Sequence, residues 1–363
     1  MKIISVVGTR PQFIKLAVLS KELRKKHREI ILHTGQHYDK ELSEVFFSDL
    51  SISKPDYNLG IGSAEHGKQT GRMLVAIEKI LLSEKPKLVI VYGDTNSTLA
   101  GALAAAKQNI PVAHVEAGLR SYKKSMPEEI NRVLTDHVSS LLFCPTPTSV
   151  KNLKKEGITK GVHLVGDVMY DSLRDHIEVA ERKSRIMQKL SLQKKDYYLV
   201  TIHRAENTDI KENLQKVIRI VASLDKKVVL PIHPRTRKML IGFSLWNRLL
   251  SIPRLVVIDP VSYLDMLILE KNARFVLTDS GGVQKETYFL KTPCLTLRKE
   301  TEWVETLKNR WNNLVGLSSE NALRVIRNFT MPDFSPPESG NELIFRDARY
   351  KIAKLISSFD KLV

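Results

Sequence analysis

A run of residues ending at Glu286 combines a hydroxyl, two adjacent glycines and a carboxylate where an apolar segment changes to a helical pattern. The apolar residues before it predict a short buried strand. A strand, a tight turn and a helix start would present bare backbone N–H groups at the positive end of a helix dipole, where phosphate binds well. Ser280 could add a hydroxyl donor beside Gly281 and Gly282. The Glu286 carboxylate could reach a pair of ribose hydroxyls. In the alternative interpretation the glycines only allow the bend, and Ser280 or Asp279 caps the helix.

A second basic pattern follows the first predicted strand, where Gly8 and Thr9 lead into Arg10 and a helix that carries Lys15. Pro11 suits the first helical turn, where no N–H is needed. Arg10 and Lys15 would lie at the ligand end of the sheet and could face a diphosphate, Arg10 through two parallel hydrogen bonds. The alternative is an exposed pair of charges at a helix start, which is unfavourable because positive charge opposes the helix dipole there unless an anion is near.

Three carboxylates follow other predicted strands. Asp94 comes just after one strand, Glu116 ends the next, and Glu128 stands beside Glu129 after a proline. Such groups can act as general acid and base or stabilise an oxocarbenium-like cation. Each also has a simpler explanation, because Asp94 could cap a helix and either glutamate could favour the positive end of one. Their convergence at one sheet edge, opposite a basic phosphate site, would favour catalysis.

Polar residues also follow strands in the second half of the chain. His203 could donate a hydrogen bond to phosphate or transfer a proton, and the alternative is a histidine that only packs. Arg235 and Arg237 follow the next strand. They are candidate anion contacts, with surface charge as the alternative.

Several common sites are missing from the sequence. Residues 62–68 imitate a P-loop, but Gln69 replaces the Ser or Thr that would hold Mg²⁺. No dinucleotide-binding glycine fingerprint, no nucleophile-elbow motif and no zinc-ligand spacing occurs. We therefore expect no NAD, no metal and no other cofactor.

The residues between these motifs predict two runs of alternating strands and helices. Most strands are continuous apolar runs, typical of parallel strands covered on both faces. The expected strands are 3–7, 30–33, 88–92, 112–116, 141–144, 163–165, 198–202, 228–232, 255–258, 275–278 and 294–297. We predict an α/β protein with two doubly wound, Rossmann-like domains, 1–168 and 169–340, and a final helix in 341–363 that packs back on the first domain. Ligands would bind beyond the carboxyl ends of the strands, in the cleft between the domains.

Composition narrows the class of protein. The chain has 363 residues and a formal net charge of +17 at pH 7. Its lysines are dispersed over helix faces, so we interpret the charge as a solvated surface and expect no nucleic acid partner. No apolar run approaches the roughly 20 residues that cross a bilayer, and the first residues lead directly into a strand. With only two cysteines, which make no disulfide framework, we expect a cytoplasmic protein without a membrane partner.

Together and in this order, the motifs resemble those of the non-hydrolysing UDP-N-acetylglucosamine 2-epimerases, essentially end to end. None is decisive alone. They are Gly8-Thr9-Arg10-Pro11 with Ile14-Lys15, Gly93-Asp94-Thr95, the run from His114 to Arg120, Pro127-Glu128-Glu129, and the run from Thr278 to Gly282. The resemblance implies a glycosyltransferase-B-like fold, a UDP-sugar substrate and a homodimer.

The resemblance also implies a mechanism. The family eliminates UDP from C1 to give a 2-acetamidoglucal, then adds UDP back after protonation at the opposite face of C2. Arg10, His203 and Ser280, with the helix end behind Gly281, would stabilise the departing diphosphate. Glu286 would hold the ribose.

The resemblance also implies roles for the three carboxylates and for Lys15. Asp94, Glu116 and Glu128 match the catalytic carboxylates that handle the C2 proton and the cationic transition state, and which of them removes the proton stays open. Lys15 matches an active-site lysine near the diphosphate.

Departures from the family pattern bear on the substrate. Pro11-Gln12-Phe13 stands where many members have Pro-Glu, and residues 166–172 and 201–208 look like a branch that acts on UDP-2,3-diacetamido-2,3-dideoxyglucuronate. The extra carboxylate of that substrate would need an additional cation. We expect UDP-N-acetylglucosamine as substrate, with the diacetamido-uronate as the alternative. A hydrolysing epimerase fits the first motif less well, and a glycosyltransferase of the same fold would need an acceptor groove.

A further group of residues resembles the region where bacterial members bind a second, activating substrate molecule. These residues are Gln36, His37, Gln69 and Arg72. Whether such regulation operates in this chain stays open.

Overall fold

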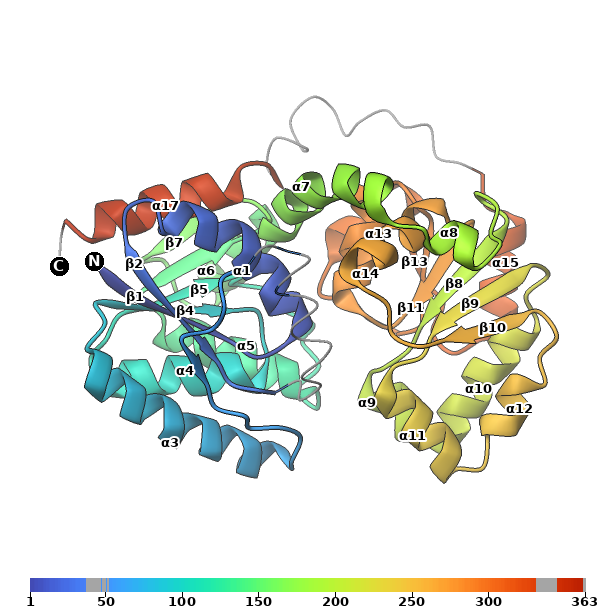
Figure 1. The fold of residues 1–363 in the computed structure, drawn as a ribbon, viewed down its shortest axis with the longest axis horizontal. Coiled ribbons are helices and arrows are strands. Elements are labelled where there is room, and N and C mark those ends of the chain that lie inside the picture. The colour runs from blue at the N-terminus through green and yellow to red at the C-terminus, as the bar shows by residue number, and fades with distance from the viewer. Residues whose placement is uncertain (37–46, 48–49, 51, 331–344, 362–363) are drawn as a thin grey trace. The chain divides into compact units, whose positions relative to one another are not determined.

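The computed structural model describes residues 1–36, 47, 50, 52–330 and 345–361. The chain divides into two units, Met1–Asp175 with Ser335–Val363, and His176–Phe334. The division falls within helix α7 (Val168–Lys183). Each unit is a parallel sheet with helices on both faces (Figure 1). The predicted α/β class is confirmed.

The first unit contains a seven-stranded sheet in the order β3-β2-β1-β4-β5-β6-β7, in which every neighbouring pair is parallel. Its strands are β1 (Lys2–Val7), β2 (Arg28–His33), β3 (Tyr57–Asn58), β4 (Leu88–Tyr92), β5 (Val112–Val115), β6 (Leu141–Cys144) and β7 (Val162–Leu164). Its helices, besides the start of α7, are α1 (Arg10–Leu23), α3 (His66–Glu84), α4 (Asn96–Lys107), α5 (Pro127–Val138), α6 (Pro147–Lys155) and α17 (Ala348–Phe359).

Strands of the first sheet are apolar on both faces because helices cover both. One face buries alternate residues of β1, β2 and β4, such as Ile4 and Val6, against Met73 and Ile77 of α3 and the alanines of α4. Helix α17 packs against α1 and buries Ile352 and Ile356 completely. The helix predicted near the C-terminus is therefore part of the first unit in the described residues.

The second unit contains a six-stranded parallel sheet in the order β10-β9-β8-β11-β12-β13. Its strands are β8 (Tyr197–Thr201), β9 (Lys227–Pro231), β10 (Leu255–Ile258), β11 (Phe275–Thr278), β12 (Cys294–Thr296) and β13 (Asn312–Leu314). Its helices are α8 (Ile186–Lys189), α9 (Ala205–Thr208), α10 (Lys211–Ala222), α11 (Pro234–Gly242), α12 (Trp246–Leu250), α13 (Tyr263–Asn272), α14 (Gly281–Phe289), the 3₁₀ helix η1 (Val304–Arg310) and α15 (Ser319–Arg327).

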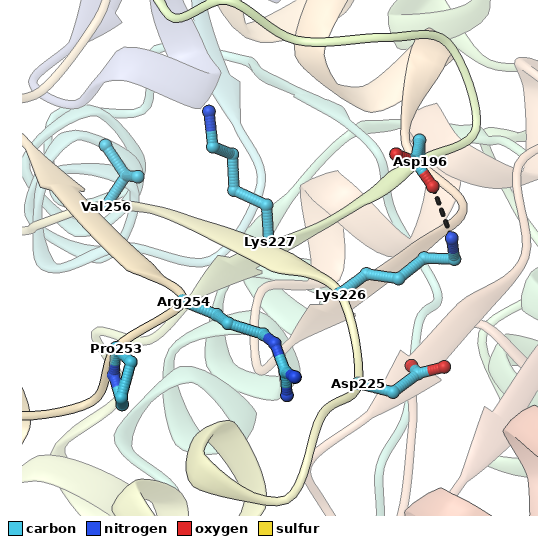
Figure 2. A pocket seen from close by; sticks show the side chains of 7 residues that line it. All are labelled: Asp196, Asp225, Lys226, Lys227, Pro253, Arg254 and Val256. Carbon is cyan, nitrogen blue, oxygen red and sulfur yellow. Dashed lines mark hydrogen bonds and ion pairs between the residues drawn. The ribbon is translucent and has the colours of Figure 1, made fainter.

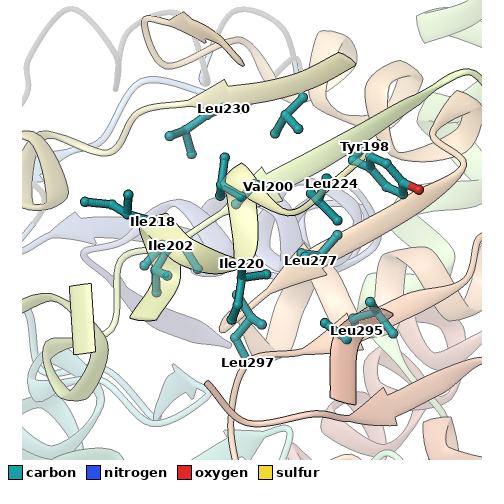
Figure 3. Packing of buried hydrophobic residues seen from close by; sticks show 14 of the residues in the cluster. Tyr198, Val200, Ile202, Ile218, Ile220, Leu224, Leu230, Leu277, Leu295 and Leu297 are labelled. Atoms are coloured by element: carbon teal, nitrogen blue, oxygen red, sulfur yellow. The ribbon is translucent and has the colours of Figure 1, made fainter. Parts of the chain in front are cut away.

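Successive side chains of each strand in the second sheet point to opposite faces, and each face packs against different helices. Tyr198, Val200 and Ile202 of β8 and its following loop point to the same face, where they pack against residues of α10 such as Ile218 (Figure 3). The opposite face takes the intervening residues and lies against α13 and α14. Burial on both faces explains why the strands read as continuous apolar runs.

All strands expected from the sequence are present, with ends that differ by no more than two residues. The short edge strands β3 and β13 were not predicted. Each has only two or three residues and contains asparagine, which is depleted in strands. No helix in the described ranges is long and apolar enough to span a membrane.

Candidate functional site

Each sheet changes winding direction between two neighbouring strands, and Arg10, Asp94, His203 and Ser280 follow those strands. Glu116 and Glu128 follow the next strand of the first sheet, β5. In the first unit the chain winds outward from β1 in one direction and from β4 in the other. In the second unit the corresponding strands are β8 and β11. Doubly wound sheets bind ligands at such switch points because the loops at the carboxyl ends diverge there.

The turn after β1 is held by Gln12, which is buried. Its Oε1 accepts hydrogen bonds from the backbone N–H groups of Gly8 and Thr9 at 2.7 and 3.1 Å. Its Nε2 donates to the Tyr92 carbonyl oxygen at 2.7 Å and so joins the turn to the end of β4. The glutamine that departs from the family pattern therefore connects the two loops of the switch point. Arg10 begins α1 beside this turn and is partly exposed.

Lys15 and Glu116 form a nearly buried ion pair at the same edge. The Lys15 Nζ lies 2.7 Å from the Glu116 Oε1. Glu116 has a φ of 76°, in the left-handed region that residues other than glycine rarely adopt. Such strained backbone is stable only when its surroundings fix it, and it is concentrated at functional sites.

Asp94 and Glu129 meet at one arginine. Arg132 of α5 is 1% exposed, and its Nε donates to the Asp94 Oδ2 at 3.1 Å while its Nη1 donates to the Glu129 Oε2 at 2.9 Å. Glu129 also accepts from the backbone N–H groups of Ser121 and Tyr122. Glu128 is only partly buried and makes no hydrogen bond or ion pair with another described residue. The geometry thus joins Glu129 to Asp94, and the sequence prediction of Glu128 stays a prediction.

A buried charge network positions these loops, and sequence reasoning assigned it no role. The His114 ring bonds the Asp136 Oδ1 through Nδ1 and the Gly93 carbonyl oxygen through Nε2, both at 2.7 Å. Arg120 donates to the other Asp136 oxygen at 2.7 Å. Burial opposes ionisation of Asp136, but His114 and Arg120 outweigh it and hold its pKa below the ordinary value.

The residues predicted as a secondary site are only partly brought together. Gln36 accepts from the Ser97 N–H at 3.0 Å, and Gln69 accepts from Asn96 at 2.8 Å. Arg72 is exposed, and His37 lies outside the described residues. Asn96 in turn accepts from Asn131, which also donates to the Asp94 carbonyl oxygen at 3.0 Å. Hydrogen bonds therefore connect Gln69 to the backbone of Asp94.

Asp279 organises the switch point of the second unit. It is completely buried, and its carboxylate accepts hydrogen bonds from the backbone N–H groups of His203 and Arg204 at 3.1 Å. Asn207 donates to it at 3.0 Å. The His203 Nδ1 lies 3.4 Å from the same carboxylate, while its side chain remains 39% exposed. Asp279 does not cap the helix. It holds the His203 loop beside the turn after β11.

Ser280 is the cap of α14, and its Oγ accepts from the Val283 N–H at 3.5 Å. Gly281 is required by a close approach, because a Cβ there would lie 2.4 Å from the Glu302 Oε1. That carboxylate cannot easily move away, since it is buried and paired with Arg298 at 2.9 Å. At Gly282 a Cβ would meet only the Ser280 Oγ, at 3.8 Å. The second glycine therefore leaves open space in front of the helix N-terminus, where an anion could approach the backbone.

The two other predicted residues, Glu286 and Arg235, differ in burial. Glu286 lies in α14 and is 5% exposed. Arg235 lies at the surface and forms an ion pair with Asp209 across the loop after β8. The ion pair with Asp209 already explains the charge of Arg235 at this position. Its predicted role in binding an anion stays a prediction.

A cavity of about 440 Å³ lies in the second unit, at the amino-terminal ends of β9 and β10 (Figure 2). It is lined by Asp196, Asp225, Lys226, Lys227, Pro253, Arg254 and Val256. Lys226 pairs with Asp196 there. Because ligands of such sheets bind at the opposite, carboxyl edge, we assign this cavity no part in the site. Among the described residues no group of three His, Cys, Asp or Glu side chains could hold a metal ion.

Two parallel α/β units with charged side chains at their switch points define a Rossmann-type nucleotide-binding class of protein. A family model described as UDP-N-acetylglucosamine 2-epimerase matches residues 21–357. A Methanococcus maripaludis protein named UDP-N-acetylglucosamine 2-epimerase homolog is 58% identical over 91% of this chain and 92% of its own. A Pseudomonas aeruginosa protein named UDP-2,3-diacetamido-2,3-dideoxy-D-glucuronate 2-epimerase is 46% identical over 98% of this chain and 100% of its own.

A solved structure agrees over nearly the whole chain. The crystal structure of Methanocaldococcus jannaschii UDP-GlcNAc 2-epimerase in complex with UDP-GlcNAc and UDP matches with a TM-score of 0.90 and 43% identity, covering 99% of this chain and 100% of that one. The chain belongs to the UDP-N-acetylglucosamine 2-epimerase family and is an isomerase with the glycosyltransferase-B-like fold. The predicted family, fold and enzyme class are confirmed.

The two glycines of the α14 turn give opposite expectations for stability. Gly281→Ala should lower the free energy of unfolding by about 1–3 kcal/mol, because the new Cβ would displace the Glu302 carboxylate from its ion pairs. Gly282→Ala should leave it unchanged or raise it by up to about 1 kcal/mol, because alanine favours a helix and meets open space. Urea unfolding of both variants measures the difference. Equal destabilisation would contradict the packing described here.

Proposed function

We propose that this chain interconverts UDP-N-acetylglucosamine and UDP-N-acetylmannosamine by elimination and re-addition of UDP. A carboxylate removes the C2 proton, the C1–O electron pair leaves with UDP, and a C1–C2 double bond forms in a 2-acetamidoglucal. A proton then returns to the opposite face of C2, and UDP adds back to C1. The observation that carries the proposal is that Asp94, Glu116 and Glu129 each lie beside a cation at the carboxyl edge of the first sheet, in a chain of this family.

Residues of the first unit would handle the proton and the positive charge. Asp94 and Glu116 are the proposed acid and base, with Glu128 or Glu129 as the third carboxylate. Their support is the contact of Asp94 and Glu129 with Arg132, and of Glu116 with Lys15. A carboxylate held in place by a cation needs little reorganisation when charge develops on the sugar.

Residues of the second unit would hold UDP. The backbone N–H groups at Gly281 and Gly282 and the Ser280 hydroxyl would bind phosphate, His203 would donate to it, and Glu286 would bind the ribose. The open space in front of Gly282 supports this role. Gly282→Ala, expected to remain folded, should therefore raise the Kd for UDP.

A second substrate is supported by one comparison. The Pseudomonas aeruginosa relative named for UDP-2,3-diacetamido-2,3-dideoxy-D-glucuronate is 46% identical over 98% of this chain. Its named substrate carries a carboxylate, which an additional cation would have to meet. We place it second because the relative at 58% identity carries the N-acetylglucosamine name.

Solvent exchange tests the reaction directly. Incubation of UDP-N-acetylglucosamine with the protein in D₂O, without added NAD or metal, should place deuterium at C2 while UDP-N-acetylmannosamine appears in the NMR spectrum. The diacetamido-uronate, tested in parallel, decides between the two substrates by its rate of exchange. If neither nucleotide sugar exchanges at C2, the proposal is wrong.

Four single substitutions test the carboxylates. Asp94→Asn and Glu116→Gln should lower kcat by about 10²–10⁴-fold, as expected for loss of an acid or base, while UDP still binds. Comparison of Glu128→Gln with Glu129→Gln identifies the third carboxylate as the one whose loss lowers kcat by a similar factor. Glu212→Gln, on the exposed surface of α10, is the matched control. Equal loss of UDP binding in all the variants would point to a structural role instead.

We also propose that the protein is a cytoplasmic homodimer. Apolar side chains lie exposed on α3 (Val75, Leu82) and on α5 (Ile130, Leu134), two helices that pack against α4. Exposed apolar side chains on these two helices support an interface there, because large apolar patches mark contacts between proteins. Sedimentation equilibrium should give twice the chain mass of 41.3 kDa, and Val75→Glu combined with Leu82→Glu should halve it. A single-chain mass for the unaltered protein would exclude the dimer.

The two cysteines, both free and buried, are consistent with a reducing compartment.

A further inference from the structure

A second buried carboxyl group, that of Glu270, lies on the helix that packs against the helix of Glu286, the proposed ribose-binding residue. Glu270 is on α13 and Glu286 on α14, two helices that pack against each other. Glu270 is 0% exposed and Glu286 5% exposed. The packed helices and the burial of both side chains bring the two carboxyl groups together, and Glu286 acts on Glu270 through its charge and a hydrogen bond. Sequence reasoning gave Glu270 no role, because nothing in the pattern of α13 distinguishes it from a surface glutamate.

Among the described residues, none donates a hydrogen bond that would stabilise the ionised form of Glu270. Neither of its carboxylate oxygens accepts a hydrogen bond from a described residue. The titratable groups that face it are Glu286 from α14, Tyr197 from β8 and Cys294 from β12, and none is a cation. The Tyr197 hydroxyl donates instead to the Leu269 carbonyl oxygen at 2.6 Å.

Two ionised carboxylates can only accept hydrogen bonds, so contact between them requires one proton. Burial, followed by the charge and the hydrogen bond of Glu286, raises the pKa of Glu270 well above its ordinary value. Glu270 therefore keeps its proton under conditions in which an exposed glutamate has lost it. In that state its hydroxyl is a donor for Glu286.

We propose that Glu270 is a positioning residue for the nucleotide: it retains a proton, donates it in a hydrogen bond to Glu286, and so fixes the carboxylate that binds the ribose hydroxyls. This inference rests on the proposed function, because it assigns Glu286 to UDP. Loss of the proton would place two negative charges in a buried site and would drive the side chains apart.

The sign of the pH dependence follows from proton linkage. The pKa of Glu270 is higher in the folded protein than its ordinary value of 4.5, so the folded state binds more protons than the unfolded state. This contribution to stability is complete below pH 4.5, and it is lost as the pH rises through the folded pKa. The affinity for UDP should fall over the same upper range, by at most about tenfold per pH unit for one proton.

Calorimetric titration with UDP from about pH 5 to about pH 10 tests this, with thermal unfolding recorded in the same buffers. Glu270→Gln keeps a donor for Glu286 but cannot ionise. Its Kd should match that of the unaltered protein at low pH and should be several-fold lower at high pH. Glu270→Met removes the donor at similar volume and should weaken UDP binding at every pH. Ionisation of UDP itself affects all proteins equally and cancels in the comparison. Glu212→Gln controls for the loss of one acid.

The outcomes separate the two proposals. If Glu270→Gln shows the same fall in affinity with pH as the unaltered protein, or if Glu270→Met binds UDP as tightly at every pH, the positioning role is wrong. If Glu270→Met does not fold, the pH profile of Glu270→Gln still decides. If the unaltered protein fails to bind UDP at any pH, the proposed function fails first and the inference with it.

Discussion

A buried carboxylate must be surrounded by donors, and this constraint shapes the second unit at its switch point. Asp279 is completely buried, where an unpaired charge would be strongly unfavourable. The backbone N–H groups of His203 and Arg204 and the amide of Asn207 supply the donors. Because those groups belong to the loop after β8, satisfying one charge locks that loop to the turn after β11. The loop that carries His203 is thereby joined to the turn that carries Ser280, and such pre-organisation reduces the cost of binding.

The first unit uses the same principle with a larger network. Asp136 accepts from the His114 ring, from Arg120 and from the Gly118 N–H at 3.1 Å. The ring of His114 reaches on to the Gly93 carbonyl oxygen. One buried acid therefore fixes both the loop that carries Asp94 and the loop in which Glu116 has its strained backbone. Local strain of this kind persists only where the surrounding structure determines the conformation.

The sequence predicted the elements well and the side-chain partners poorly, for a physical reason. Strand positions follow from continuous apolar runs, which record burial directly. The order of strands, and hence the switch points, depends on crossovers that no local pattern encodes. Asp94 and Ser280 were found because each follows a strand. Arg132 and Asp136 lie within α5, where neither spacing nor type separates them from residues of a solvated helix face. Gln12 was interpreted as a mark of substrate, and no local pattern indicated that its contacts connect two loops.

A buried acid is stable either as a carboxylate surrounded by donors or as a neutral, protonated group, and this chain contains both arrangements. Donors surround both Asp136 and Asp279, and at Asp136 they hold the pKa below its ordinary value. Both side chains therefore fix the loops that supply those donors. Glu270 has no such donors among the described residues, so it is stable when neutral, and a neutral acid can itself donate. An ionised acid at that position could not support Glu286, since two carboxylates repel each other. A cation would support it but would also neutralise the charge that attracts the ribose hydroxyls. A protonated acid orients its neighbour and leaves that neighbour's negative charge in place.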